Sequence, residues 1–223
     1  MSIKHEVDVT CPNCRTPHPF GVWESINTSE NPEMRSAVRD KSAFLFVCPT
    51  CGEKSMIDYG FLYHQMEDKI IIYYADSDAR AEEIKTMLAA EDASDMVGDL
   101  RKGKYLVRVV RSLNELREKL AIFDAGLDDR IIEIYKIYVL SVYRKEHPDD
   151  HDIQTLYVRD PNGKRNLIQI IAGGKTGGVS EIPEGFYKEL CLQHLGSLPD
   201  LREDEPFIDR RWALEKMGLS DQL

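Results

Sequence analysis

Four of the five cysteines in this 223-residue sequence fall into two matching pairs, each with the spacing of a metal-binding turn. The first pair is Cys11-Pro12-Asn13-Cys14, and the second is Cys48-Pro49-Thr50-Cys51. Two thiolates separated by two residues can reach one ion from a single tight turn, and Zn²⁺ prefers four tetrahedral ligands of this type. The sequence therefore predicts one structural zinc ion held by Cys11, Cys14, Cys48 and Cys51.

The two pairs differ in the residue that follows them and lie far apart in the chain. Gly52 gives the second turn a permissive backbone, whereas Arg15 follows the first pair. The intervening residues 15–47 exceed the usual loop of a small zinc finger, so the predicted ribbon must carry an insertion. Closing a longer loop costs little extra entropy, which keeps a single site feasible. The alternative is two separate redox-active or reactive Cys-x-x-Cys pairs.

Other residues near these motifs have simpler structural explanations. His5 and His18 lie close to the first pair, but four cysteines already complete a tetrahedral site that is closed to water. Gly173-Gly174-Lys175-Thr176 is similar to the end of a phosphate-binding loop, yet Gln169 stands where that motif requires a glycine. We therefore interpret the glycine-rich segment, which extends to Gly178, as a flexible loop after a strand.

Two candidates for further chemistry lie in the second half of the chain. The segment His147-Pro148-Asp149-Asp150-His151-Asp152 combines imidazole and carboxylate groups that can hold a transition metal. Proline and a high charge density are more typical of a solvated turn. Cys191 shares the apolar side of a predicted helix with Leu190 and Leu195, which favours a core thiol over a nucleophile. The sequence contains no catalytic constellation beyond this one candidate segment.

The elements that must position the cysteines are short strands. Residues 6–10 and 20–23 predict a hairpin around the first pair, and residues 44–47 predict a strand that leads into the second. Between them, Asn31-Pro32 predicts a helix that runs to about Arg39 with Asn31 as its N-cap. Downstream, we expect strands at 55–59, 61–74 with a turn at 66–69, 105–110, 154–159 and 166–171, and helices at 77–91, 112–126, 128–146, 183–195 and 209–217.

These elements predict an α+β protein in which a zinc ribbon is built into an antiparallel sheet. A helical pair from Ser112 to His147 follows the sheet, and a hairpin with two helices ends the chain. We expect residues 1–147 to form a zinc-ribbon and helical domain on which residues 148–223 pack. The helix 128–146 is apolar nearly all round, so it must be buried inside the monomer or form a homodimer contact through Tyr138 to Tyr143.

The residues around the cysteines resemble the bacterial CpXC domain over about residues 7–136. The resemblance rests on both cysteine pairs and on four other segments, Ile26-Asn27-Thr28, Pro32-Glu33-Met34-Arg35, Leu62-Tyr63-His64 and Gly126-Leu127-Asp128-Asp129-Arg130. It implies a presumed zinc-binding domain without an assigned biochemical role. No catalytic residue is carried over from it.

The net charge and the distribution of apolar residues limit the classes of function that the sequence supports. The net charge of −10 opposes nucleic-acid binding, which depends on phosphate neutralisation. The absence of a signal-like N-terminus or a long apolar stretch predicts a cytoplasmic protein without a membrane partner. We therefore expect a zinc-stabilised module that binds an unknown protein partner. A nucleic-acid-binding zinc ribbon is the alternative, and an enzyme whose site cannot be read from the sequence is the second.

Overall fold

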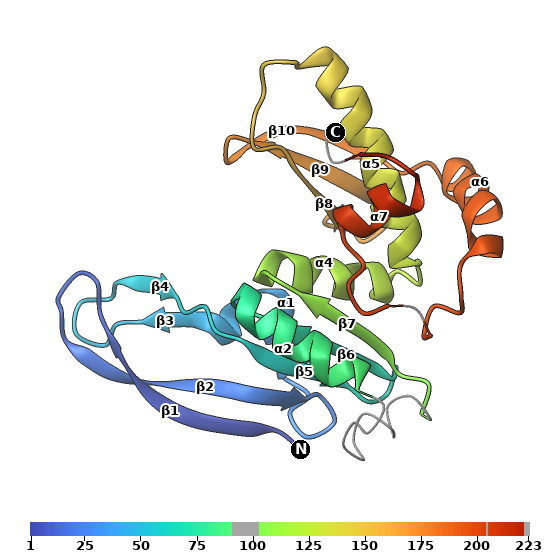
Figure 1. The fold of residues 1–223 in the computed structure, drawn as a ribbon. Coiled ribbons are helices and arrows are strands. Elements are labelled where there is room, and N and C mark those ends of the chain that lie inside the picture. Colours follow the sequence, from blue (N-terminus) through green and yellow to red (C-terminus); the bar gives the residue numbers. More distant parts are fainter. Residues whose placement is uncertain (91–102, 204, 221–223) are drawn as a thin grey trace. The chain divides into compact units, whose positions relative to one another are not determined.

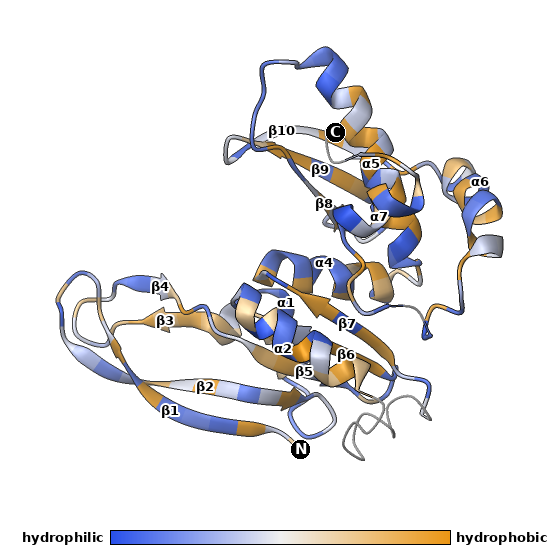
Figure 2. Ribbon diagram, viewed as in Figure 1, coloured by the Kyte–Doolittle hydropathy of each residue, from blue (hydrophilic) through white to orange (hydrophobic). Residues whose placement is uncertain are grey.

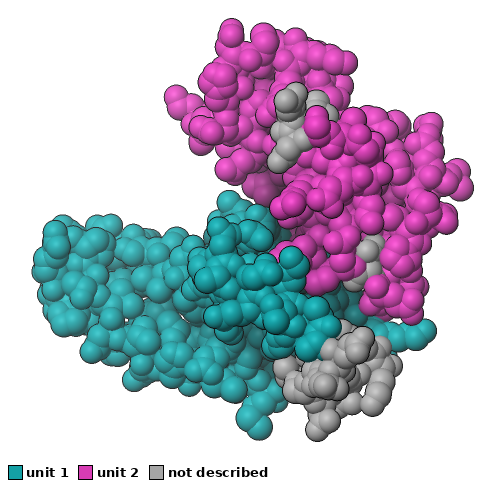
Figure 3. Space-filling model, viewed as in Figure 1, with its two compact units in different colours: residues 1–116 teal, residues 117–223 magenta. Residues whose placement is uncertain are grey.

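The computed structural model describes residues 1–90, 103–203 and 205–220 (Figure 1). Their contacts divide the chain into two compact units, residues 1–116 and 117–223, which Figure 3 colours separately. Both units combine helices with strands, which confirms the predicted α+β class. None of the helices in the described segments has the length and apolar character needed to cross a membrane. The expected domain boundary after residue 147 stays a prediction.

A five-stranded sheet organises the first unit, in the order β1-β2-β5-β6-β7. Its strands are β1 (Ile3–Thr10), β2 (Pro17–Asn27), β5 (Phe61–Gln65), β6 (Ile70–Tyr74) and β7 (Leu106–Val110). The β1–β2 and β5–β6 pairs are antiparallel, but β2–β5 and β6–β7 are parallel. The prediction of an antiparallel sheet is therefore wrong. Parallel neighbours require long crossover connections, and residues 28–60 and 75–105 supply them.

The first of these connections carries the second cysteine pair on a small hairpin of its own. Strands β3 (Leu45–Val47) and β4 (Lys54–Met56) pair antiparallel and form a separate two-stranded sheet (Figure 1). A short helix, α1 (Met34–Arg39), and a 3-10 turn (Ser42–Phe44) precede this hairpin. The insertion expected inside the ribbon is therefore ordered structure.

The predicted start of α1 is wrong by two residues. The backbone carbonyl of Asn31 accepts a hydrogen bond from Met34 N at 3.0 Å, and its side-chain amide donates to Glu33 Oε1 at 3.2 Å. Residues 31–33 therefore form a turn, and Glu33 precedes the first helical residue without a side-chain cap. Asn31 therefore lies before the helix and is not its N-cap.

Side-chain caps fix the starts of α2 (Asp78–Ala89) and α4 (Leu113–Asp124). Ser77 Oγ accepts a hydrogen bond from Arg80 N at the start of α2, and Ser112 Oγ accepts one from Glu115 N at the start of α4. The predicted last residue of the first of these helices, Glu91, lies outside the described residues. Gly126 follows α4 with a φ of +68°, the left-handed conformation of a common helix C-terminal cap.

The second unit contains a three-stranded antiparallel sheet in the order β10-β9-β8. The predicted hairpin is confirmed as β8 (Gln154–Arg159) and β9 (Asn166–Ala172). The interpretation of the next segment as a flexible loop is wrong, because Lys175–Glu181 forms strand β10. Gly173 and Gly174 have φ values of +53° and +76° and make the two-residue turn between these strands.

Helix α5 (Asp129–Glu146) forms the centre of the second unit. It contacts α6 (Glu184–His194), α7 (Arg210–Lys216), β8 and β9, and Figure 2 shows the apolar character that it shares with β9. Twelve of its 18 residues are buried, so packing within the chain satisfies most of its apolar surface. Tyr138 and Val142 remain 37% and 55% exposed. A homodimer contact at this end of the helix stays a prediction.

Candidate metal centre

The two cysteine pairs adopt the same backbone structure. Cys11 N donates to Thr16 O at 3.1 Å, and Arg15 N donates to Cys11 O at 3.0 Å. In the second pair, Cys48 N donates to Glu53 O at 2.8 Å and Gly52 N donates to Cys48 O at 2.9 Å. The same two hydrogen bonds thus close both turns, one at the end of the β1–β2 hairpin and one at the end of β3–β4.

The residue after each pair adopts a left-handed backbone conformation. The φ of Arg15 is +63°, and that of Gly52 is +76°. A glycine adopts this conformation at little cost, whereas a side chain with a Cβ does not. The arginine therefore keeps the geometry of the first turn but introduces local strain that the second turn avoids.

The turns bring all four sulfurs together. The four Sγ atoms lie within 4.8 Å of one another, with Cys11–Cys51 and Cys14–Cys48 separations of 3.6 Å. Zinc–sulfur bonds of about 2.3 Å give tetrahedral sulfur–sulfur edges of about 3.8 Å. Disulfide sulfurs would lie only about 2.05 Å apart. The geometry therefore fits four ligands around one metal ion.

Little apolar surface supports this centre. Cys11 and Cys48 are buried with Phe46, and Val9, Phe20 and Ile57 pack partly buried against them. The rings of Phe20 and Phe46 meet edge to face at 6.1 Å. Cys14 is half-buried and Cys51 is exposed, so water can reach one side of the cluster. Because this apolar core is small, the four cysteines must provide much of the link between the two hairpins.

The local environment also gives the thiols of Cys14 and Cys11 different pKa values. Hydrogen bonds from the hydroxyl and backbone N–H of Thr16 lower the pKa of Cys14 to about 6. A hydrogen bond from the backbone of Cys14 favours the Cys11 thiolate, but burial and the neighbouring sulfurs raise the pKa of Cys11 to about 11. Cys14 is therefore the more acidic of these two thiols, and a bound metal ion deprotonates a coordinating thiol outright.

The two nearby histidines each contact another side chain and do not belong to the four-sulfur cluster. His18 Nε2 lies 3.0 Å from Thr50 Oγ1, and His5 Nδ1 lies 3.5 Å from Glu24 Oε1. Across residues 1–90, 103–203 and 205–220, the only group of three or more His, Cys, Asp or Glu side chains placed to share a metal ion is the four cysteines. Asn13 Nδ2 does approach Cys51 Sγ at 3.6 Å, which can stabilise a thiolate.

The remaining sequence candidates have structural roles. Residues 147–152 are exposed and form the turn after α5, as expected for a solvated segment. The ring of His147 stacks against Tyr143, and Asp150 accepts a hydrogen bond from the Tyr143 hydroxyl at 2.6 Å. Cys191 packs half-buried against the core of the second unit, and burial raises the pKa of its thiol.

Sequence reasoning missed a cluster of buried charges on α4 and α5. Lys119 Nζ lies 3.0 Å from Asp129 Oδ2 and 3.1 Å from Glu133 Oε1. Lys136 Nζ lies 3.0 Å from both Glu118 Oε1 and Glu133 Oε2. The side chains in these pairs are 9% exposed or less. The available signal was Glu133 and Lys136, three residues apart within the otherwise apolar stretch 131–140.

A second missed group joins the parallel strands β2 and β5. Thr28 N donates to His64 O at 3.0 Å, and Thr28 Oγ1 donates to Glu67 Oε2 at 3.2 Å. Asn27 Oδ1 accepts a hydrogen bond from Ser29 N at 3.0 Å, which fixes the exit from β2. Asn27 and Thr28 are almost fully buried. These polar residues therefore hold the start of the crossover connection.

The chain belongs to the CpXC protein family, whose match covers residues 9–136, more than half of the sequence. The match includes both cysteine pairs, so the family and the four-sulfur cluster coincide. It also crosses the boundary between the two units and ends at Lys136, within the buried charge cluster. No curated protein and no solved structure matches the chain.

Proposed function

We propose that the protein binds one zinc ion through Cys11, Cys14, Cys48 and Cys51, and that the ion shapes a zinc ribbon used to bind a protein partner. The proposal for the metal rests on four converging sulfurs, since tetrahedral thiolate sites select zinc or iron–sulfur chemistry. Four protein ligands close the coordination sphere to water. The zinc would therefore stabilise the two hairpins and would not act in catalysis.

The proposed role in binding a protein partner rests on an exposed apolar face of the β3–β4 hairpin. Phe46 points into the cysteine cluster, so Leu45 and Val47 lie on the opposite face of β3. Met56 is the cross-strand partner of Leu45 and shares this face. The exposed fractions of Leu45, Val47 and Met56 are 36%, 46% and 46%. Gathered apolar side chains on one surface are typical of protein interaction sites.

The first experiment tests the metal. The protein should contain one zinc ion per chain by elemental analysis when it is purified without a chelator. The double variant Cys48→Ser/Cys51→Ser should lose the zinc, because only one pair of thiolates remains. The matched control is Cys191→Ser, which removes the remaining cysteine and should keep full zinc content. Wild-type protein without zinc would overturn the proposed metal.

The second experiment tests the apolar face. Cross-linking and mass spectrometry on cells that produce the protein should identify a partner whose cross-links surround β3 and β4. Val47→Asp should abolish the association while zinc content stays at one per chain, because Val47 points away from the sulfurs. Leu192→Asp is the control, since Leu192 is an 87% exposed apolar residue on α6 in the other unit. Equal association of both variants would exclude this face as the binding site.

A further inference from the structure

A second candidate site lies within the second unit, residues 117–223. A groove of about 510 Å³ is lined by the C-terminal half of α5, Phe186 of α6, residues 177–180 of β10 and Ile170 of β9. Its volume falls in the range of sites for small organic ligands, about 300–1,000 Å³. Its lining is mainly aromatic and aliphatic, so it suits a ligand with an apolar body.

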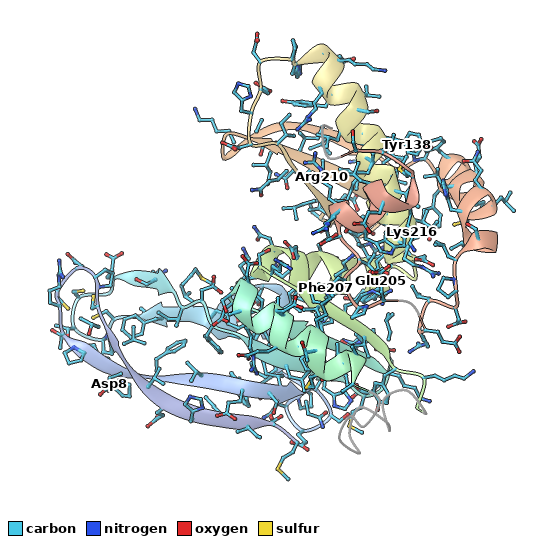
Figure 4. The ribbon with its side chains drawn as sticks, viewed as in Figure 1. Asp8, Tyr138, Glu205, Phe207, Arg210 and Lys216 are labelled. Carbon is cyan, nitrogen blue, oxygen red and sulfur yellow. The ribbon has the colours of Figure 1, made fainter. Side chains whose placement is uncertain are left out.

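Aromatic rings form the walls of the groove. The Tyr138 and Phe186 rings lie 5.9 Å apart at an interplanar angle of 82°, and Tyr135 contacts Phe186 at 5.6 Å and 66° (Tyr138 is labelled in Figure 4). At the other end, Tyr143 stacks edge to face with His147. Tyr135 is held by a hydrogen bond from its hydroxyl to Glu181 O at 2.9 Å. The aromatic walls are thus partly fixed before any ligand arrives.

A glycine of β10 lets one tyrosine of the groove pack directly against the strand backbone. A Cβ atom placed on Gly177 would lie 2.5 Å from the Tyr143 hydroxyl, so the tyrosine lies directly against bare backbone. The same hydroxyl donates to Asp150 Oδ2 at 2.6 Å. Strand β10 also changes register between Thr176 and Gly178. Such a bulge interrupts an edge strand and disfavours the pairing of an extended peptide with it.

The described residues that line the groove include a negatively charged side chain but no lysine or arginine. Glu146 carries the only carboxylate among them. Asp150 adds a second carboxylate next to Tyr143. Tyrosine and phenylalanine rings attract cations through their negative faces. Asp150 is not itself a lining residue, and the ring of His147, which does line the groove, packs against Tyr143. Aromatic walls with the Glu146 carboxylate at one end therefore complement a ligand that has an apolar body and a positive head.

We propose that this groove binds an organic cation, an amine or quaternary ammonium compound with an aryl or alkyl body. The apolar body packs against Val139, Val142 and Ile170, and the cationic head faces Glu146 and the neighbouring tyrosine rings. Cation–π contacts at exposed sites contribute about 0.5–1 kcal/mol each, which corresponds to roughly two- to fivefold in affinity. This inference is independent of the zinc site and of the β3–β4 face.

The probe is benzyltrimethylammonium, with uncharged benzyl alcohol as the comparison, titrated into the full-length protein and followed by NMR. We expect saturable shifts with the cation and much weaker binding of the alcohol. Glu146→Gln and Tyr138→Leu should each weaken binding of the cation about two- to fivefold. Glu189→Gln, which removes an exposed carboxylate from α6, is the matched control and should bind like the wild type.

Three outcomes would overturn the proposal. The first is no saturable binding of the cation, and the second is equal affinity for cation and alcohol, which would indicate a simple apolar pocket. The third is a dimer in light scattering that Tyr138→Glu converts to a monomer, because a second copy of the chain would then cover the groove. Zinc content is measured in each variant, so a failure here remains distinguishable from a failure of the metal site.

Discussion

The cysteine centre of the first unit and the charge cluster of the second are stabilised in opposite ways. Around the cysteines, only a few apolar side chains are buried, and four soft ligands converge from two turns. Around Lys119 and Lys136, the charges are enclosed next to a large apolar core that includes Ile131, Ile134 and Trp212. A small core therefore relies on a cross-link, whereas a large core can enclose charges provided that they are paired.

The two lysines are held charged by their carboxylate partners although both are buried. Burial alone lowers the pKa of an ammonium group, but the carboxylates of Glu118 and Glu133 raise the pKa of Lys136 well above its usual value. Burial raises the pKa of Glu118. For Glu133, burial acts in the same direction, yet Lys136 and Lys119 hold its pKa below the usual value. The cluster therefore depends on each partner being present.

The largest effect should follow removal of the proposed zinc. Structural zinc contributes on the order of 10 kcal/mol of binding energy in finger peptides, although the five-stranded sheet should retain part of the fold here. Chelation should abolish hydrogen-exchange protection in β3, β4 and the cysteine-proximal ends of β1 and β2. Protection in α5 should be unchanged. Uniform loss across both units would contradict a local role for the metal.

A smaller but still large effect is expected from Lys136→Met. This change leaves Glu118 and Glu133 without their shared ammonium group, and breaking a buried pair costs about 3–5 kcal/mol. Chemical denaturation measures the free energy of unfolding. Lys188→Met is the matched control, because Lys188 forms an exposed pair with Glu184 and its loss should leave stability nearly unchanged. Equal losses would show that the buried network is not selectively stabilising.

The fall in the free energy of unfolding at acid pH should depend on Glu133. Because its folded pKa is lowered, its contribution is present above the unfolded pKa of about 4.3 and is lost as the pH falls through the folded value. Glu133→Gln should therefore be less stable than the wild type at neutral pH. Between about pH 5 and about pH 3, its free energy of unfolding should fall less steeply. Parallel curves for both proteins would refute this linkage.

The smallest effect is expected from substitutions at the residue that follows each cysteine pair, Arg15 or Gly52. Gly52→Arg should destabilise the second turn by about 1 kcal/mol, because it places a side chain at a φ of +76°. Arg15→Gly should relieve similar strain in the first turn, partly offset by the greater flexibility of glycine in the unfolded chain. Competition with a zinc indicator should show weaker binding by Gly52→Arg and equal or tighter binding by Arg15→Gly. The opposite order would contradict the equivalence of the turns.

Local sequence features determined much of this protein. The cysteine spacing indicated both turns, and the caps at Ser112 and Gly126 placed the ends of α4, because each depends on residues close together in the chain. The hairpin of β8 and β9 followed from its turn residues in the same way. Asn31 shows the limit of such reasoning, since residues 31–33 form a turn and α1 begins only at Met34.

Only the tertiary structure decided which distant segments meet. The parallel pairing of β2 with β5 joins strands separated by a long insertion, and periodicity along one strand does not specify its neighbour. The partners of Lys119 and Lys136 are decided only when α4 and α5 pack and enclose both lysines with their carboxylates. The groove likewise requires α5, Phe186 and the bare backbone of Gly177 together. Such sites arise from non-local packing, which no spacing within one segment encodes.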